Sequence, residues 1–144
     1  MIVSTRGKNA VKLLLDLAQH NDGKPVPLKE TAARQGISLK YLEQTAASLH
    51  KAGLVQSVKG NQGGYLLRYA PERYTVMHIL TIVEGSLAPT DCVGEKCCPN
   101  SSSCVTFRLW KHLDDTIKNT LENITLASLL EWQEKMVIAG EYSI

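Results

Sequence analysis

The sequence contains no apolar run of about 18 residues, the length that a membrane-spanning helix needs. The basic residues near its start, Arg6 and Lys8, are not followed by the apolar segment of a secretory signal peptide. Cysteine is absent outside residues 92–104, and we find no internal repeat and no low-complexity tail. From these absences we expect a cytoplasmic protein without a membrane partner.

The composition is that of a globular protein. Of the 144 residues, 44% are hydrophobic and 21% are charged, so the chain can bury a core large enough to offset the entropy lost on folding. Wholesale disorder is therefore excluded. The length predicts one compact domain, or a small domain with an additional arm.

The charges are divided unevenly along the chain. Residues 1–70 carry ten Lys and Arg against four Asp and Glu, a net charge of +6, whereas residues 71–144 carry six against ten, a net charge of −4. A basic half suits a polyanion such as nucleic acid. Scattered surface charge without a function is the alternative at this point.

Three amphipathic helices are predicted in the basic half. Apolar residues recur on one face over residues 6–20, over 28–35 and from 39 up to Gly53. Gly36 is placed to end the second helix, and Ser38 is suited to cap the third. The short turn between these two helices predicts a helix-turn-helix. The polar face of the third helix can read the edges of DNA bases, and it carries Lys40, Tyr41, Gln44, Thr45 and Ser48.

A β-hairpin is predicted behind the helix-turn-helix. Two extended segments, 54–59 and 65–69, flank a glycine-rich tip at 60–64. Such a hairpin is the wing of a winged-helix domain. The residues that its tip presents are Lys59, Asn61 and Gln62. Basic residues around this domain would attract phosphates without regard to base sequence, and these are Arg6, Lys8, Lys12 and Arg68. A protein-interaction module of the same shape is the alternative to DNA binding.

The second half predicts two further helical parts joined by a loop. Thr75 can cap a helix over 76–84, and the aperiodic residues 85–104 predict a functional loop. A long helix from residue 105 carries an apolar seam from Trp110 to Ile124, and a shorter helix starts near Thr125. The predicted fold is therefore mainly α with a small β-hairpin wing.

The cysteines form a cluster. Cys92, Cys97, Cys98 and Cys104 fall within 13 residues. Gathered thiolates repel one another unless a cation lies between them, so a metal centre explains the spacing. Zinc sites usually use C-x2-C pairs, which this loop lacks, whereas iron–sulfur clusters accept more varied spacings. Spacing alone favours a cluster and leaves zinc, or a metal-free thiol or disulfide switch, open.

Several blocks of residues occur in an order that is typical of one family. The blocks are Ser4-Thr5-Arg6-Gly7-Lys8, Gly36-Ile37-Ser38 followed by Tyr41-Leu42-Glu43-Gln44, L-H-K-A-G-L-V at 49–55, Gly63-Gly64-Tyr65-Leu66-Leu67, three cysteines spaced by six, and Asn123-Ile124-Thr125-Leu126. In these blocks the chain resembles, over nearly its whole length, the Rrf2 family of winged-helix regulators.

The resemblance implies a homodimer whose long C-terminal helices cross and whose two winged helices address a palindromic operator. Family members read bases with the start of the recognition helix and with the wing. Lys40 stands where a small polar residue is usual, and Lys59 replaces an arginine, so the base sequence read by the wing can differ. The candidate DNA-binding residues are Arg6, Ser38, Lys40, Tyr41, Glu43, Gln44, Lys59, Asn61 and Gln62.

The resemblance also implies an iron–sulfur cluster, 2Fe–2S rather than 4Fe–4S, on Cys92, Cys98 and Cys104. Cluster-binding relatives complete the site with a histidine three residues after the last cysteine, and this chain has Phe107 there. The fourth ligand is therefore open. Cys97 is the nearest thiol, His112 lies more than one helical turn beyond Phe107, and an external thiol or water can also fill the position.

Together these expectations describe a DNA-binding regulator, a repressor, that is not an enzyme. Its predicted parts are a winged helix-turn-helix (1–84), a cluster-binding loop (85–104), and a dimerisation helix with a C-terminal helix (105–144). Two alternatives stay open. One is a regulator that responds to cysteine metabolism or thiol state without a cluster, and the other is a zinc-stabilised protein-interaction module. A thiol redox enzyme is disfavoured because the loop lacks a C-x-x-C pair.

Overall fold

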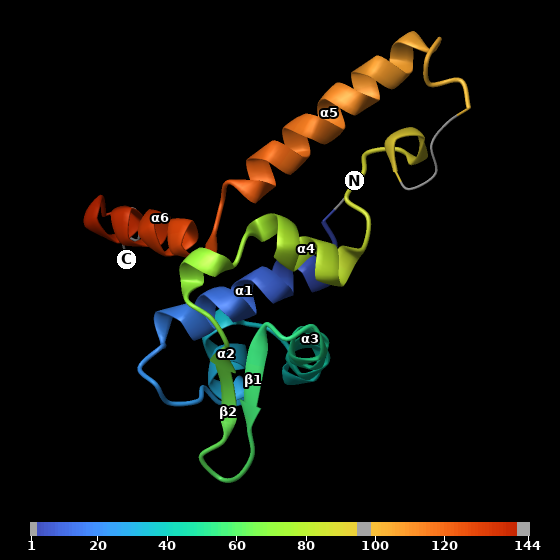
Figure 1. Cartoon of the computed structure of the whole chain (residues 1–144). Coiled ribbons are helices and arrows are strands. Elements are labelled where there is room, and N and C mark those ends of the chain that lie inside the picture. The colour runs from blue at the N-terminus through green and yellow to red at the C-terminus, as the bar shows by residue number, and fades with distance from the viewer. Residues whose placement is uncertain (1–2, 95–98, 141–144) are drawn as a thin grey trace.

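The computed structural model describes residues 3–94 and 99–140. The structure is mostly helical with a two-stranded antiparallel hairpin, which confirms the predicted fold class. In Figure 1 the helices of the basic half and the hairpin form one body, and a long helix extends away from it. None of the helices in the described ranges is both long enough and apolar enough to cross a membrane. The elements are α1 (Thr5–Gln19), α2 (Leu28–Gln35), α3 (Leu39–Lys51), β1 (Val55–Val58), β2 (Gly64–Leu67), η1 (Pro71–Arg73), α4 (Val76–Glu84), η2 (Asp91–Val93), α5 (Val105–Glu122) and α6 (Leu126–Ile138).

Helix α1 supplies the centre of the core. Its predicted apolar face is buried, and α3, α4 and α6 pack against it. The helix begins one residue earlier than predicted, because the Ser4 hydroxyl accepts a hydrogen bond from the Gly7 N–H and caps it. The buried apolar residues of this helix are Ala10, Leu13, Leu14, Leu17 and Ala18.

The helix-turn-helix consists of α2 and α3. Gly36 ends α2 in the left-handed conformation, with φ 63°, as predicted, since a glycine adopts it without a steric penalty. Leu42, Ala46 and Leu49 of α3 are buried. The predicted capping role of Ser38 is wrong. Its side chain makes no capping hydrogen bond, and only its carbonyl joins the helix, by accepting from the Leu42 N–H.

The hairpin is shorter than predicted and is fixed to the body. Val55 pairs with Leu67 and Val58 with Gly64. On the outer side of β2, the N–H and carbonyl of Tyr65 exchange hydrogen bonds of 2.9 Å with those of Val26. A side chain at position 64 would collide with the Val26 main chain, so this contact requires glycine there.

The second half begins with α4, which Thr75 caps as predicted by accepting from the His78 N–H. Leu121, near the end of α5, and Ile124, in the turn after it, pack against a small second core of buried apolar residues from α4 and the following loop. Toward its N-terminal end α5 is exposed, and Val105 is 80% exposed. Only part of the predicted apolar seam is therefore packed within the chain.

Candidate functional site

The N-terminal half of α3 presents polar side chains to the surface. Lys40, Glu43 and Gln44 are exposed, as is Ser38 just before the helix, and Tyr41 is 59% exposed. Leu42 and Leu49 hold the opposite face of the helix in the core. The residues predicted to read bases thus share one accessible surface.

Thr45 does not belong to this surface, although the sequence analysis placed it there. Its side chain is buried, and its hydroxyl donates to the Tyr41 carbonyl at 2.9 Å. Position 45 lies beside Leu42, Ala46 and Leu49 on the buried side of α3, and the bond to the preceding turn satisfies the hydroxyl within the helix. Thr45 is therefore not among the exposed side chains predicted to read bases.

A hollow of about 490 Å³ separates the start of α1 from α3. It brings Arg6 together with Tyr41 and Gln44, which lie far apart in the sequence, over a floor of Ile82 and Val83 from α4. The remaining lining residues are Thr5, Asn9, Thr45 and Ser48. The sequence analysis did not name Asn9, which is buried on the apolar side of α1. A polar residue among apolar ones is the pattern that could have marked it as a residue of this hollow.

The tip of the wing forms a separate polar surface. Lys59, Asn61 and Gln62 are exposed. Asn61 and Gln62 border a second hollow, beside the loop between α1 and α2, and neither lines the hollow next to Arg6. Because β1 packs against α3, wing and recognition helix are held side by side at the end of the body opposite to α5 (Figure 1).

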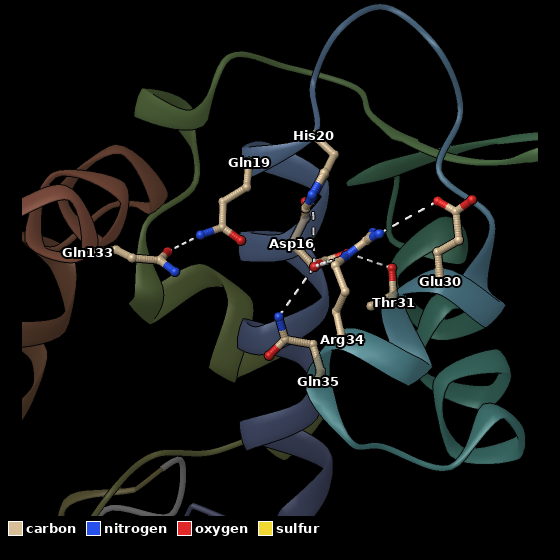
Figure 2. Close-up of polar contacts among 8 residues, drawn as sticks. All are labelled: Asp16, Gln19, His20, Glu30, Thr31, Arg34, Gln35 and Gln133. Carbon is tan, nitrogen blue, oxygen red and sulfur yellow. Dashed lines mark hydrogen bonds and ion pairs between the residues drawn. The ribbon is translucent and has the colours of Figure 1, made fainter. Parts of the chain in front are cut away.

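A buried carboxylate fixes the helix-turn-helix to α1 (Figure 2). Asp16 accepts hydrogen bonds from Thr31 Oγ1 at 2.6 Å, from Arg34 Nε at 3.0 Å and from Arg34 Nη2 at 2.8 Å, with Gln35 Nε2 at 3.3 Å. Burial opposes ionisation of this carboxyl, but the bonds from Arg34, Thr31 and Gln35 outweigh it and lower the pKa of Asp16. The sequence analysis missed this network. The network could have been suspected from Asp16, a charged residue that the sequence places among the apolar residues of the buried face of α1.

The start of α1 is also tied to the end of α4. Glu84 Oε1 accepts from the Ser4 main-chain N–H at 3.1 Å and from the Ser4 hydroxyl at 2.5 Å. The Ser4 hydroxyl bond is the main reason why the pKa of Glu84 is lowered. Glu84 is the last residue of α4, so the loop that carries the cysteines begins directly after a contact with the helix that carries Arg6.

Two of the predicted ligands lie in described parts of the loop. Cys92, in η2, and Cys104, at the start of α5, are free, half-buried thiols. The Thr106 hydroxyl, 3.1 Å from Cys104 Sγ, and then the N–H groups of Phe107 and Thr106 lower the pKa of the Cys104 thiol. Cys97 and Cys98 lie outside the described residues.

The described residues include two of the three cysteines that the sequence predicts as cluster ligands. Within residues 3–94 and 99–140, no three His, Cys, Asp or Glu side chains are grouped closely enough to hold a metal ion. However, η2, which carries Cys92, packs against α5, the helix that begins directly after Cys104. Two free thiols, of which Cys104 has a lowered pKa, fit an iron–sulfur centre in their chemistry. His112 is exposed.

The comparison with known proteins decides the family. Residues 3–132 match the Rrf2 family, which is described as an iron-dependent transcriptional regulator. The chain belongs to the Rrf2 family. As a member it is a DNA-binding transcriptional regulator of the winged-helix, IscR-like type.

Individual relatives cover most of the chain. The HTH-type transcriptional regulator IscR of Erwinia tasmaniensis is 44% identical over 139 residues, which are 96% of this chain and 84% of that protein. The structure of T. potens IscR matches with a TM-score of 0.77 and 42% identity, covering 94% of this chain and 90% of that one. The structure of CymR, the global cysteine regulator of B. subtilis, matches with a TM-score of 0.77 and 32% identity, covering 92% and 98%.

Proposed function

We propose that this Rrf2 protein acts in the cytoplasm as a homodimer, binds a palindromic DNA operator and represses transcription. Its operator affinity would change with an iron–sulfur cluster, 2Fe–2S rather than 4Fe–4S, on Cys92, Cys98 and Cys104. The working division is a DNA-binding domain (1–84), a cluster loop (85–104) and a dimerisation part (105–144).

The hollow between α1 and α3 carries the DNA-binding part of the proposal. There Arg6 lines the same hollow as Tyr41 and Gln44. A guanidinium suits a backbone phosphate, and a phenol and a carboxamide can hydrogen-bond base edges in the major groove. This arrangement supports Arg6 as a phosphate contact and the exposed start of α3 as the base-reading element.

The exposed part of α5 supports the homodimer. Val105, Leu109 and Leu113 leave an apolar strip on a helix that extends from the body (Figure 1). Monomeric proteins rarely leave such a strip uncovered. A second copy of the same helix offers a matching apolar surface, and a two-fold arrangement would present two recognition helices to a palindrome.

The loop supports a link between ligand state and DNA affinity. An iron–sulfur cluster supplies a rigid junction between thiolates. Shared ligation of Cys92 and Cys104 would fix η2 to the start of α5, while Glu84 fixes the beginning of the same loop to α1 through Ser4. Such a coupling is typically worth about 1 to 3 kcal/mol, a change in affinity of about 5- to 150-fold.

The direct experiment uses a duplex selected from a random pool by the anaerobically reconstituted protein. We expect this duplex to be preferred over random competitor DNA, and we expect its dissociation constant to change by at least about fivefold when the cluster is removed. Equal affinity before and after removal would contradict the cluster linkage alone. A failure to select any sequence in either state would contradict operator binding.

A cluster-free, thiol-responsive regulator is the second candidate. Phe107 stands where the resemblance places a histidine ligand, and the chain is also similar to CymR, the global cysteine regulator of B. subtilis. Anaerobically purified protein without bound iron, whose DNA affinity changes on thiol oxidation, would favour this candidate.

A further inference from the structure

Tyr74 lies buried at the root of the wing. Its hydroxyl donates to the Leu54 carbonyl at 2.5 Å and accepts from the N–H groups of Arg68 and Tyr69 at 3.0 and 3.1 Å. Leu54 directly precedes β1, and Arg68 and Tyr69 directly follow β2. One phenol oxygen therefore closes the open end of the hairpin.

The main chain of the same residue is attached to the turn between α5 and α6. The Tyr74 carbonyl accepts from the Leu126 N–H at 2.9 Å, and the next bond of this bridge runs from the Val76 N–H to the Ile124 carbonyl at 2.8 Å. Tyr74 thus joins the wing through its side chain and the end of the long helix through its backbone.

Three hydrogen bonds of this junction depend on the hydroxyl. The Arg68 N–H also reaches the Leu54 carbonyl, at 3.2 Å, whereas the Tyr69 N–H donates to the phenol. A phenol is protonated at neutral pH, and burial raises the pKa of Tyr74 further, so its bond to Leu54 is retained there. A phenylalanine would fill the same volume without making these bonds.

We infer that Tyr74 is a positioning residue for DNA binding. It holds the wing at a fixed place relative to the α5–α6 turn, although it does not itself belong to the DNA-facing surface. The inference rests on the proposed contact of Lys59 with DNA. It adds that the placement of this contact depends on a hydroxyl at the opposite end of the hairpin.

The test is a double-mutant cycle between Tyr74→Phe and Lys59→Ala, with a fluorescein-labelled duplex selected by the wild-type protein as the probe. In the wild-type background we expect Lys59→Ala to weaken binding about fivefold and to lower the salt slope by about 0.9. In the Tyr74→Phe background both effects should largely vanish, because the wing is no longer held against the DNA. Gln44→Ala, on the recognition helix, should cost the same in both backgrounds.

Tyr69→Phe is the matched control, because it also removes a phenol hydroxyl at the root of the wing, and the ring of Tyr69 is 42% exposed. It should leave the cost of Lys59→Ala unchanged. If Lys59→Ala costs the same in the wild-type and Tyr74→Phe backgrounds, the inference is overturned while the proposed function stands. If Lys59→Ala has no effect in the wild type, the wing contact is wrong and the inference fails with it.

A measurement without substitution keeps the inference testable should Tyr74→Phe not fold. Hydrogen exchange in the wild-type protein should show the amides of Tyr69 and Leu126 opening with the same free energy, because Tyr74 holds both. Exchange of the Tyr69 amide more than about tenfold faster than that of Leu126, after correction for intrinsic rates, would show that wing and turn open separately and would overturn the inference.

Discussion

Asp16 on α1 and Arg34 on α2 form a two-point contact, in which Nε of the guanidinium donates to Oδ1 at 3.0 Å and Nη2 to Oδ2 at 2.8 Å (Figure 2). The aspartate side chain is fully buried, and that of Arg34 is 34% exposed. A planar fork of this kind fixes orientation as well as distance. The angle at which the helix-turn-helix meets the central helix is therefore set by a polar contact within the core.

Substitution of Asp16 by asparagine is expected to lower the free energy of unfolding by about 2 to 3 kcal/mol, less than for a fully buried pair because Arg34 is partly exposed. Urea unfolding followed by circular dichroism measures the change. The control is Asp115→Asn, which removes the exposed partner of Lys111 and should cost less than about 0.5 kcal/mol. Equal costs for the two variants would contradict the structural role of Asp16.

The same contact predicts a pH dependence of stability. Because the pKa of Asp16 is lower in the folded chain than its ordinary value, its contribution is fully present above about pH 5 and is lost as the pH falls through the lowered folded pKa. The difference in unfolding free energy between the wild type and Asp16→Asn should therefore shrink on acidification. A difference that stays constant from pH 6 down to the acid transition would rule this explanation out.

Arg6 and Gln44 should contribute to DNA binding in different ways. Arg6→Ala should weaken binding to all duplexes and lower the salt slope by about 0.9, because a phosphate contact is lost. Gln44→Ala should leave the salt slope unchanged and reduce discrimination against altered bases by about 1 to 3 kcal/mol. Titrations of selected and random duplexes at several salt concentrations separate the two. An altered base preference in Arg6→Ala would contradict the assignment.

Single serine substitutions of the cysteines test the ligand set. After anaerobic reconstitution, Cys92→Ser, Cys98→Ser and Cys104→Ser should lose iron, sulfide and visible absorbance. Cys97→Ser should keep them, because adjacent residues point in different directions and Cys98 is the proposed ligand. Loss of the cluster in Cys97→Ser together with its retention in Cys98→Ser would reverse the assignment of the two neighbours.

A charge in the apolar strip of α5 should disrupt the homodimer. Leu109→Glu should shift the chain toward a monomer in analytical ultracentrifugation, because it would bury an unpaired carboxylate between the two copies. Lys111→Glu, on another face of the same helix, is the control and should stay dimeric. If both variants remain dimeric, the interface lies elsewhere.

The sequence was sufficient to predict elements whose pattern is local. The apolar repeats of α1 and α3, the stop at Gly36 and the cap at Thr75 all follow from residues within one or two turns, and the structure confirms them. Short motifs predicted the family and the class of function, and the comparisons confirm both.

Contacts between distant residues could not be predicted in the same way. From its neighbours in the sequence, Tyr74 looks like an apolar residue that precedes a helix. Only the fold brings Leu54 to its hydroxyl and Leu126 to its carbonyl. Thr45 looked exposed because its burial, unlike its local hydrogen bond to the Tyr41 carbonyl, depends on which elements pack against α3. The cluster site depends in part on Cys98, which lies outside the described residues, so its ligand set stays a prediction.

The pairing of Tyr65 with Val26 has a consequence for association between chains. Exposed strand edges invite β-addition by other polypeptides, and aggregation commonly starts there. Here the N–H and carbonyl of Tyr65 on the outer edge of β2 are already satisfied by Val26. On that side the hairpin is closed to strand recruitment, so a projecting wing can remain in a crowded cell without acting as a template for misassembly.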